Sequence, residues 1–262
     1  MKDTPIQSNS NIQLAMDLHG AAMLDYIDGQ QDAAVIMHRD DGFAYPPIVA
    51  ARWFYEGGFP ILDSKALALC QGRILNVGAA SGAHSLFLEK QGFDVSSLEA
   101  SPSAVEVMKR RNVRAPILGG IDTIGDDTFD TILLLCGIGI VGTLDGLERF
   151  LERAKVGLRE DGLLVTDCTH PRADTLEVSQ RYCDQQAARG KYEGERTARF
   201  QYKGSFGPWF NWLTIAPELL ETHARKAGFA FDVIFSEAGR SLCVLKPSDN
   251  QLLDRTGNRC DQ

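Results

Sequence analysis

The chain has 262 residues, of which 44% are hydrophobic and 24% are charged, a balance typical of a globular protein. Its formal net charge of -8 argues against a surface that follows the phosphates of DNA or RNA, so we expect no nucleic-acid partner. No apolar run reaches the ~18 residues that a membrane helix needs, and residues 1–11 lack the apolar core of a signal peptide. The sequence therefore predicts a cytoplasmic protein with no membrane partner.

Six cysteines are spread along the chain, and no two of them form a C-x-x-C pair. At least four lie in or beside apolar segments, which is typical of buried thiols in a reducing compartment. We therefore expect neither a disulfide framework nor a metal site. The six are Cys70, Cys136, Cys168, Cys183, Cys243 and Cys260.

The first 70 residues predict a helical N-terminal cap that covers the rest of the protein. Residues 12–26 have apolar side chains at helical spacing, at Leu14, Leu18, Ala22 and Tyr26. Shorter helical stretches are expected at 33–37 and 48–55, on either side of the break at Pro46 and Pro47.

From residue 73 onward, short apolar runs alternate with helical stretches. This alternation predicts βαβ units and a parallel sheet. The expected strands are 73–77, 93–98, 114–118, 129–135 and 162–168. The expected helices are 82–91, 102–112 and 144–158, and Ser101 is expected to cap the second of them.

Beyond residue 170, the pattern predicts a helix, a hairpin, a second helix and two final strands. These are expected at 173–188, 197–215, 217–227, 231–235 and 241–245. The predicted fold class is α/β, with a doubly wound, mainly parallel seven-stranded sheet. We expect a cap over 1–70, an α/β domain over 71–247 with the hairpin as an insertion, and a flexible tail over 248–262.

A glycine loop carries the strongest functional signal. Asn76–Gly82 (Asn-Val-Gly-Ala-Ala-Ser-Gly) follows a predicted strand and opens a predicted helix. Glycines there let the backbone approach a ligand, and the helix start offers free N–H groups. Glu99 ends the next strand, where an acid can accept hydrogen bonds from both ribose hydroxyls. Together they predict an adenosine ligand.

The loop distinguishes between adenosine cofactors. A dinucleotide site has the spacing G-x-G-x-x-G, whereas position 80 here is Ala80. A cofactor without a pyrophosphate does not need that close approach. The loop therefore favours S-adenosylmethionine (SAM) over NAD and FAD, although the residues alone leave all three open.

The stretch from Gly72 to His170 resembles the class I SAM-dependent methyltransferases. Besides the glycine loop, the segments 98–102, 119–122, 129–133 and 158–164 are similar to that family's motifs. Residues 40–46 and 209–213 look like a bacterial subgroup acting on small molecules. The resemblance implies SAM as cofactor, a small-molecule substrate and the following cofactor-binding residues: Asn76, Gly78, Ala79, Ala80, Ser81, Gly82, Glu99, Ala100, Ser101, Ile121, Asp122, Cys136 and Gly137.

Two positions depart from the family pattern. Asn76 stands where an acid usually ends the first strand, and an amide lacks its negative charge. Cys136 and Gly137 stand where relatives have an asparagine-containing loop next to the sulfonium. These departures keep SAM reactions other than methyl transfer under consideration.

Two tyrosines are candidates for catalysis. Methyl transfer needs orientation of the reactants and exclusion of water, and aromatic faces stabilise a sulfonium. Tyr26 lies on the predicted N-terminal helix, where it could close the cofactor pocket. Tyr182 lies on the helix after the fifth strand of the sheet, near the expected active edge.

Three functions are compatible with these residues. The first is methyl transfer to a small molecule, with a place in natural-product biosynthesis. The second is cyclisation of SAM to azetidine-2-carboxylate with release of methylthioadenosine, without any acceptor. The third is a SAM-binding protein without catalysis. The sequence does not assign the acceptor or the oligomeric state.

Overall fold

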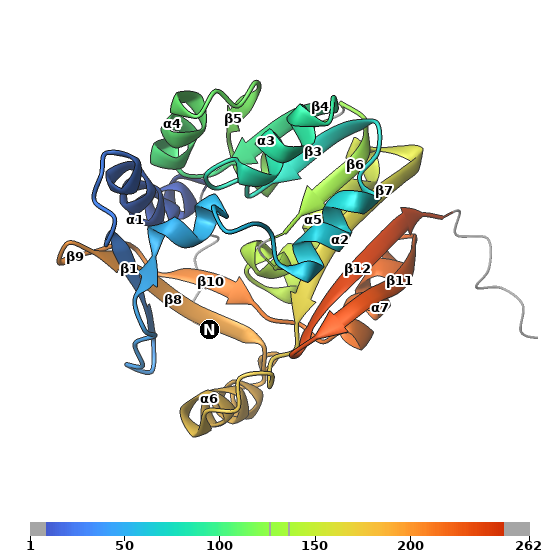
Figure 1. The fold of residues 1–262 in the computed structure, drawn as a ribbon. Helices are drawn as coiled ribbons and strands as arrows, with labels where there is room; N and C mark the ends of the chain where they lie inside the picture. Colours follow the sequence, from blue (N-terminus) through green and yellow to red (C-terminus); the bar gives the residue numbers. More distant parts are fainter. Residues whose placement is uncertain (1–8, 126, 136, 249–262) are drawn as a thin grey trace, which may run out of the picture.

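The computed structural model describes residues 9–125, 127–135 and 137–248, and its largest element is a seven-stranded sheet (Figure 1). The strand order is β11-β12-β7-β6-β3-β4-β5. The strands from β7 to β5 are parallel, whereas β12 is antiparallel to β7 and to β11. Their bounds are β3 Arg73–Val77, β4 Asp94–Glu99, β5 Pro116–Leu118, β6 Phe129–Leu134, β7 Leu158–Thr169, β11 Phe229–Glu237 and β12 Arg240–Pro247. The predicted fold class is confirmed.

Helices cover both faces of this sheet, because its central strands are apolar on both sides. On β6, Ile132 packs in one core with Phe150 of α5, while its neighbour Leu133 packs in another core with Leu62 of α2 and Leu88 of α3. The helices are α2 Ile61–Leu69, α3 Ala83–Lys90, α4 Pro102–Arg110, α5 Leu144–Gly157 and α7 Pro217–Lys226.

A second, smaller sheet has the strand order β10-β8-β1-β2, with β9 paired to β8. It packs against α1 (Asn9–Ile27) through a core that contains Met23, Ala198, Phe200 and Phe210. The sheet therefore joins the N-terminal segment to the predicted hairpin (Figure 1). The remaining elements are β1 Ala34–Arg39, β2 Ile48–Val49, η1 Ala50–Phe54, η2 Ile121–Thr123, η3 Ile138–Val141, α6 Glu177–Ala188, β8 Glu195–Tyr202, β9 Ser205–Phe206 and β10 Phe210–Leu213.

The N-terminal cap is less helical than the sequence predicts. Residues 34–37 belong to strand β1 and not to a helix, because they pair with β2 and β8 and their β-branched side chains suit a pleated surface. The stretch 48–55 is a short strand followed by the 3₁₀ helix η1. In β1, pairing with the distant strand β8 outweighs local helical spacing.

Helix α1 forms as predicted, and part of the expected apolar stripe is buried. Ala22 and Tyr26 are buried, whereas Leu14 is 61% exposed. A Cβ on Gly20 would lie 2.0 Å from Oγ of Ser101 at the start of α4, so this crossing tolerates only glycine. The helix therefore packs closely on α4 beside its buried stripe.

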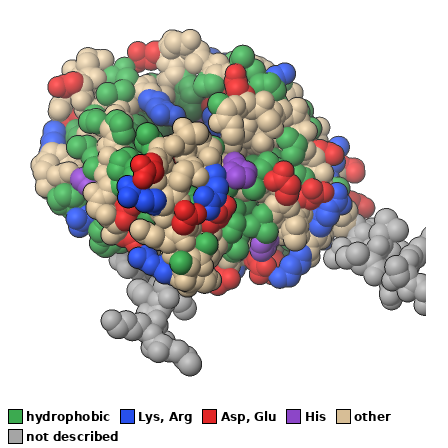
Figure 2. All heavy atoms as spheres, turned by 90° about the horizontal axis from the view of Figure 1, so that it is seen from below, with side chains coloured by type: hydrophobic (Ala, Val, Ile, Leu, Met, Phe, Trp, Pro, Cys, Tyr) green, Lys and Arg blue, Asp and Glu red, His purple; other side chains and the backbone are tan. Residues whose placement is uncertain are grey.

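The distribution of charged and apolar side chains over the described residues is consistent with the composition of the chain. Acidic and basic side chains are intermixed on the face shown in Figure 2. Within the described residues, no helix combines the length and apolar character needed to cross a membrane. The predicted flexible tail lies outside the described residues, apart from residue 248.

Candidate cofactor and acceptor site

The glycine loop forms a tight turn between β3 and α3. Gly78, Ala80 and Gly82 all have positive φ, at 68°, 50° and 76°. The N–H groups of Gly78 and Ala79 both donate to the carbonyl of Leu98, at 2.9 and 3.1 Å. The loop is thus anchored to the end of β4. Ala80 adopts a conformation that disfavours any residue with a Cβ, which indicates that neighbouring contacts hold it there.

Glu99 supplies such a contact. Its Oε2 accepts a hydrogen bond from the N–H of Ala80 at 2.8 Å, and its Oε1 accepts one from the N–H of Ser101 at 2.9 Å. Burial raises the pKa of this carboxyl group, and the backbone N–H groups of Ser101, Ala80 and Ala100 offset part of that effect. Each carboxylate oxygen has a further lone pair, so Glu99 could also accept ribose hydroxyls.

Ser101 and Ala100 begin the turn into α4. Oγ of Ser101 accepts from the N–H of Ala104 at 3.1 Å, which confirms the predicted N-cap. The same hydroxyl donates to Oδ1 of Asp17 on α1 at 2.9 Å. This hydrogen bond joins the N-cap of α4 to α1 directly beside Glu99.

Ser81 ties the glycine loop to its surroundings on the other side. Its hydroxyl donates to the carbonyl of Trp53 in η1, and its carbonyl accepts from Nη1 of Arg111 at 2.6 Å. The guanidinium of Arg111 also lies 4.9 Å from the ring centroid of Phe54. The loop is thus covered by the N-terminal segment.

Asn76 lies beneath the loop in a buried polar chain. Its Nδ2 donates to Oγ of Ser85 at 2.9 Å, and Oγ of Ser97 donates to the same atom at 2.7 Å. All three side chains are buried. This amide therefore links β3 to α3 and β4.

The segment expected to contact adenine follows β5. The N–H of Gly119 donates to the carbonyl of Glu99 at 2.9 Å, which brings this turn beside the acid. Ile121 begins the 3₁₀ helix η2 and is half-buried, while Asp122 is exposed. The turn thus lies at the same sheet edge as the glycine loop.

The loop after β6 completes this edge. Cys136 lies outside the described residues. Gly137 has a φ of 75°, and its N–H donates to Oδ1 of Asp167 at 2.9 Å. Oδ2 of Asp167 in turn accepts from Nε of Arg240 at 2.6 Å. A buried carboxylate on β7, itself paired with a cation on β12, therefore holds the loop directly.

Arg240 also reaches a second buried acid. Its Nη2 lies 3.5 Å from Oδ1 of Asp63, whose Oδ2 lies 3.1 Å from Nε2 of His84. Burial works to raise the pKa of Asp63, but the bond to His84 and the charges of His84 and Arg240 outweigh it and lower that pKa. Sequence patterns do not predict this network, because its members lie on four separate elements.

Comparison with known proteins now identifies the family. Residues 75–166 match the family described as a methyltransferase domain. A SAM-dependent methyltransferase from Bacteroides fragilis, solved in complex with S-adenosyl-L-homocysteine, is 32% identical, with a TM-score of 0.78 over 90% of this chain and 96% of that chain. The chain belongs to the class I SAM-dependent methyltransferases.

More distant methyltransferases share the fold. The CcbJ methyltransferase from Streptomyces caelestis is 15% identical, with a TM-score of 0.56 over 76% of this chain and 96% of that chain. The sugar N-methyltransferase KedS8 from Streptoalloteichus is 14% identical, with a TM-score of 0.54 over 79% of this chain and 96% of that chain. A comparison with curated proteins gives no match. None of these comparisons supports the cyclisation of SAM.

In this methyltransferase, the two tyrosines singled out for catalysis are not brought together. The hydroxyl of Tyr26 donates to Oε1 of Glu56 at 2.9 Å. Tyr182 is 1% exposed and donates to Oδ1 of Asp40 at 2.8 Å, and burial raises its pKa to about 12. Its helix α6 lies apart from β3 and β4 (Figure 1). These contacts favour structural roles for both side chains.

His19 on α1 is a candidate that the sequence analysis missed. Its ring centroid lies 3.8 Å from that of Trp53 and 5.8 Å from that of Phe200. It is enclosed by these elements yet keeps part of its surface accessible, and burial lowers its pKa to about 4. Because Trp53 contacts Ser81 of the glycine loop, this neutral imidazole stands beside the cofactor edge. Its ring contacts come from distant elements, which local helical spacing does not show.

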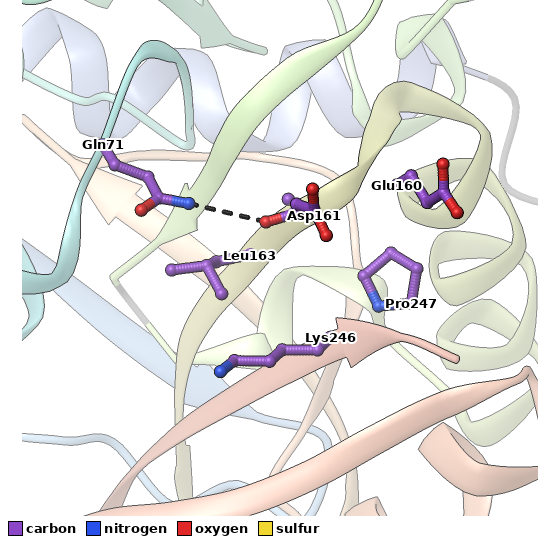
Figure 3. A pocket seen from close by; sticks show the side chains of 7 residues that line it. Gln71, Glu160, Asp161, Leu163, Lys246 and Pro247 are labelled. Atoms are coloured by element: carbon purple, nitrogen blue, oxygen red, sulfur yellow. Dashed lines mark hydrogen bonds between the residues drawn. The ribbon is translucent and has the colours of Figure 1, made fainter. Parts of the chain in front are cut away.

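A cavity lies at the edge of the large sheet opposite the glycine loop. It has a volume of about 280 Å³ and is lined by Gln71, Glu160, Asp161, Leu163 and Lys246 (Figure 3). Gln71 precedes β3, and Lys246 is near the end of the antiparallel strand β12. The cavity is thus at the amino ends of the parallel strands, whereas open α/β folds bind their ligands at the carboxyl ends.

Proposed function

We propose that the chain transfers the methyl group of SAM to a small-molecule acceptor. SAM supplies an electrophilic methyl carbon on a sulfonium, so the protein has to orient the acceptor and exclude water. The observation that carries the proposal is that other elements pack over the carboxyl edge of the large sheet. The small sheet packs on the loop after β6, and α1 packs on α4. Such an enclosed edge suits a small acceptor better than a macromolecule.

The same proposal assigns roles along the edge. Glu99 would accept the ribose hydroxyls, and the loop Gly78–Gly82 would lie along the rest of the nucleoside. Ile121 and Asp122 would flank the adenine, and Gly137 would face the reacting centre. His19 and Trp53 would line the acceptor side, since they cover the glycine loop.

The setting of the reaction is also part of the proposal. Cys70, Cys168, Cys183 and Cys243 are free and buried thiols, which fits a reducing cytoplasm. We place the acceptor among intermediates of natural-product biosynthesis, as the resemblance to the bacterial subgroup implies. In the reaction, the acceptor gains the methyl group and releases a proton, while SAM becomes S-adenosylhomocysteine.

The test combines binding with product analysis. Calorimetry with SAM is expected to show binding, and incubation with SAM and a panel of acceptors is expected to yield S-adenosylhomocysteine. A parallel incubation with SAM alone serves as the control. Methylthioadenosine formed without any acceptor would overturn methyl transfer in favour of cyclisation, and an absence of SAM binding would overturn the proposal altogether.

A further inference from the structure

A cavity of about 90 Å³ lies on the inner face of the small sheet. Trp212, in its wall, packs so closely on the loop after β6 that a Cβ on Gly139 would lie 2.3 Å from the indole. Arg196, also in its wall, donates from Nη2 to the carbonyl of Pro171, just past the end of β7, at 3.0 Å. Since β6 and β7 are parallel neighbours, the cavity adjoins the same carboxyl edge as Gly137.

The two arginines of this cavity are paired very differently. Arg39 forms a bidentate pair with Asp41, from Nε at 3.0 Å and from Nη2 at 2.6 Å. Arg196 has only neutral partners, the carbonyl of Pro171 and the hydroxyl of Tyr45 at 3.2 Å. Its Nε is buried without a hydrogen-bond partner, and within the described ranges no carboxylate lies within ion-pair distance of it. A cation so placed is stabilised by an anion.

The nearby acids are occupied elsewhere. The positive charges of Arg39 and Arg196 contribute to lowering the pKa of Asp174, against the effect of burial. Its oxygens, however, accept from the hydroxyl of Ser179 and the N–H of Leu176. Asp40 accepts from Tyr182. No described acid is therefore positioned to complete the fork of Arg196.

The size and lining of the cavity indicate which class of anion it can bind. Its volume holds a few waters, which suits one small polar group and not a whole large acceptor. The flat guanidinium fork matches a planar carboxylate, and Met37, Ala198 and Trp212 give the cavity apolar walls. We propose that this cavity binds a carboxylate of the acceptor, with Arg196 as its partner. This inference rests on the proposed function, since it gives the acceptor its chemical class.

The test uses butyrate and butyramide, a pair of probes that differ in charge. Ligand-observed NMR on the full chain, saturated with S-adenosylhomocysteine, is expected to show butyrate binding at least tenfold more tightly than butyramide. Arg196→Met is expected to weaken butyrate binding tenfold or more. Arg196→Lys keeps the charge but loses the fork, so we expect an intermediate loss.

Arg199→Met is the matched control. Arg199 is three residues along the same strand, but its guanidinium stacks on Phe206 and Trp209, 4.1 and 4.5 Å from their ring centroids. We expect this variant to bind butyrate as the unaltered chain does. Equal binding of acid and amide, no butyrate binding, undiminished binding by Arg196→Met, or tighter binding of methylphosphonate would each overturn the proposal. Because no turnover is measured, these outcomes are independent of whether methyl transfer is observed.

Discussion

Oε2 of Glu99 accepts a hydrogen bond from the N–H of Ala80 at 2.8 Å, which joins the acid at the end of β4 to the glycine loop after β3. Ala80 has a φ of 50°, a conformation that needs support from its neighbours. The acid therefore shapes the loop in addition to its proposed contact with the ribose. The two halves of the motif are one structural unit.

Substitution of Glu99 tests this unit. Glu99→Gln places an amide NH₂ where both carboxylate oxygens now accept backbone N–H groups, so one donor faces another. We expect SAM affinity to fall by tenfold or more and the free energy of unfolding to fall by about 1–3 kcal/mol. Calorimetry and urea unfolding measure the two effects. Glu106→Gln, on the exposed face of α4, is the control, and an unchanged SAM affinity in Glu99→Gln would contradict the assignment.

Arg240→Met tests the network behind the loop after β6. The change leaves Asp63 and Asp167, each 1% exposed, without their shared cation. We expect the free energy of unfolding to fall by roughly 3 kcal/mol and the amide of Gly137 to exchange faster. Urea unfolding and hydrogen exchange are the measurements. The control Arg159→Met breaks an exposed pair with Asp130 and is expected to cost about 1 kcal/mol or less.

The enclosed position of His19 predicts a pH dependence of stability. Its pKa is lowered from 6.5 to about 4, so between these values the unfolded chain binds a proton that the folded chain does not. Stability is therefore expected to fall as pH falls through this window, by up to about 3 kcal/mol from this residue. His19→Gln should flatten this part of the urea-unfolding profile between pH 7 and pH 4. Parallel profiles for the variant and the unaltered chain would contradict the prediction, and the exposed His170 provides a control.

Tyr182→Phe separates a structural role from a catalytic one. The hydroxyl donates to Asp40 and accepts from the N–H of Thr197, so its loss leaves a donor in a buried place without its acceptor. We expect a destabilisation of about 1–3 kcal/mol with SAM affinity and turnover preserved at low temperature. Tyr26→Phe removes one bond to an exposed glutamate and should cost less. A large loss of turnover in a folded Tyr182→Phe protein would restore its catalytic assignment.

The sequence was sufficient to predict the large sheet. Its strands are short apolar runs bounded by glycines, and its helices have caps such as Ser101. The glycine loop and Glu99 are separated along the chain by a regular βα spacing, so their meeting at one edge follows from the fold class.

Within the small sheet, local patterns predicted the hairpin of β8 and β10 but not its pairing with β1. β1 pairs with β8, more than 150 residues away, and no local feature of residues 34–39 predicts this pairing. Local patterns also did not single out Arg196 and His19, because the side chains around them come from distant elements. Local patterns likewise do not show that Tyr182 bonds to Asp40 after β1 and to Thr197 on β8.

The position of Arg240 in the chain has a consequence for biosynthesis. Asp167 and Gly137 emerge from the ribosome well before β12, so a nascent chain can pair β3 with β4 and β6 while the acid on β7 still lacks its cation. The acid that holds Gly137 gains its cation only when the last antiparallel pair docks. A chain interrupted before Arg240 is therefore expected to keep the glycine loop but to leave the buried acid behind Gly137 without its cation.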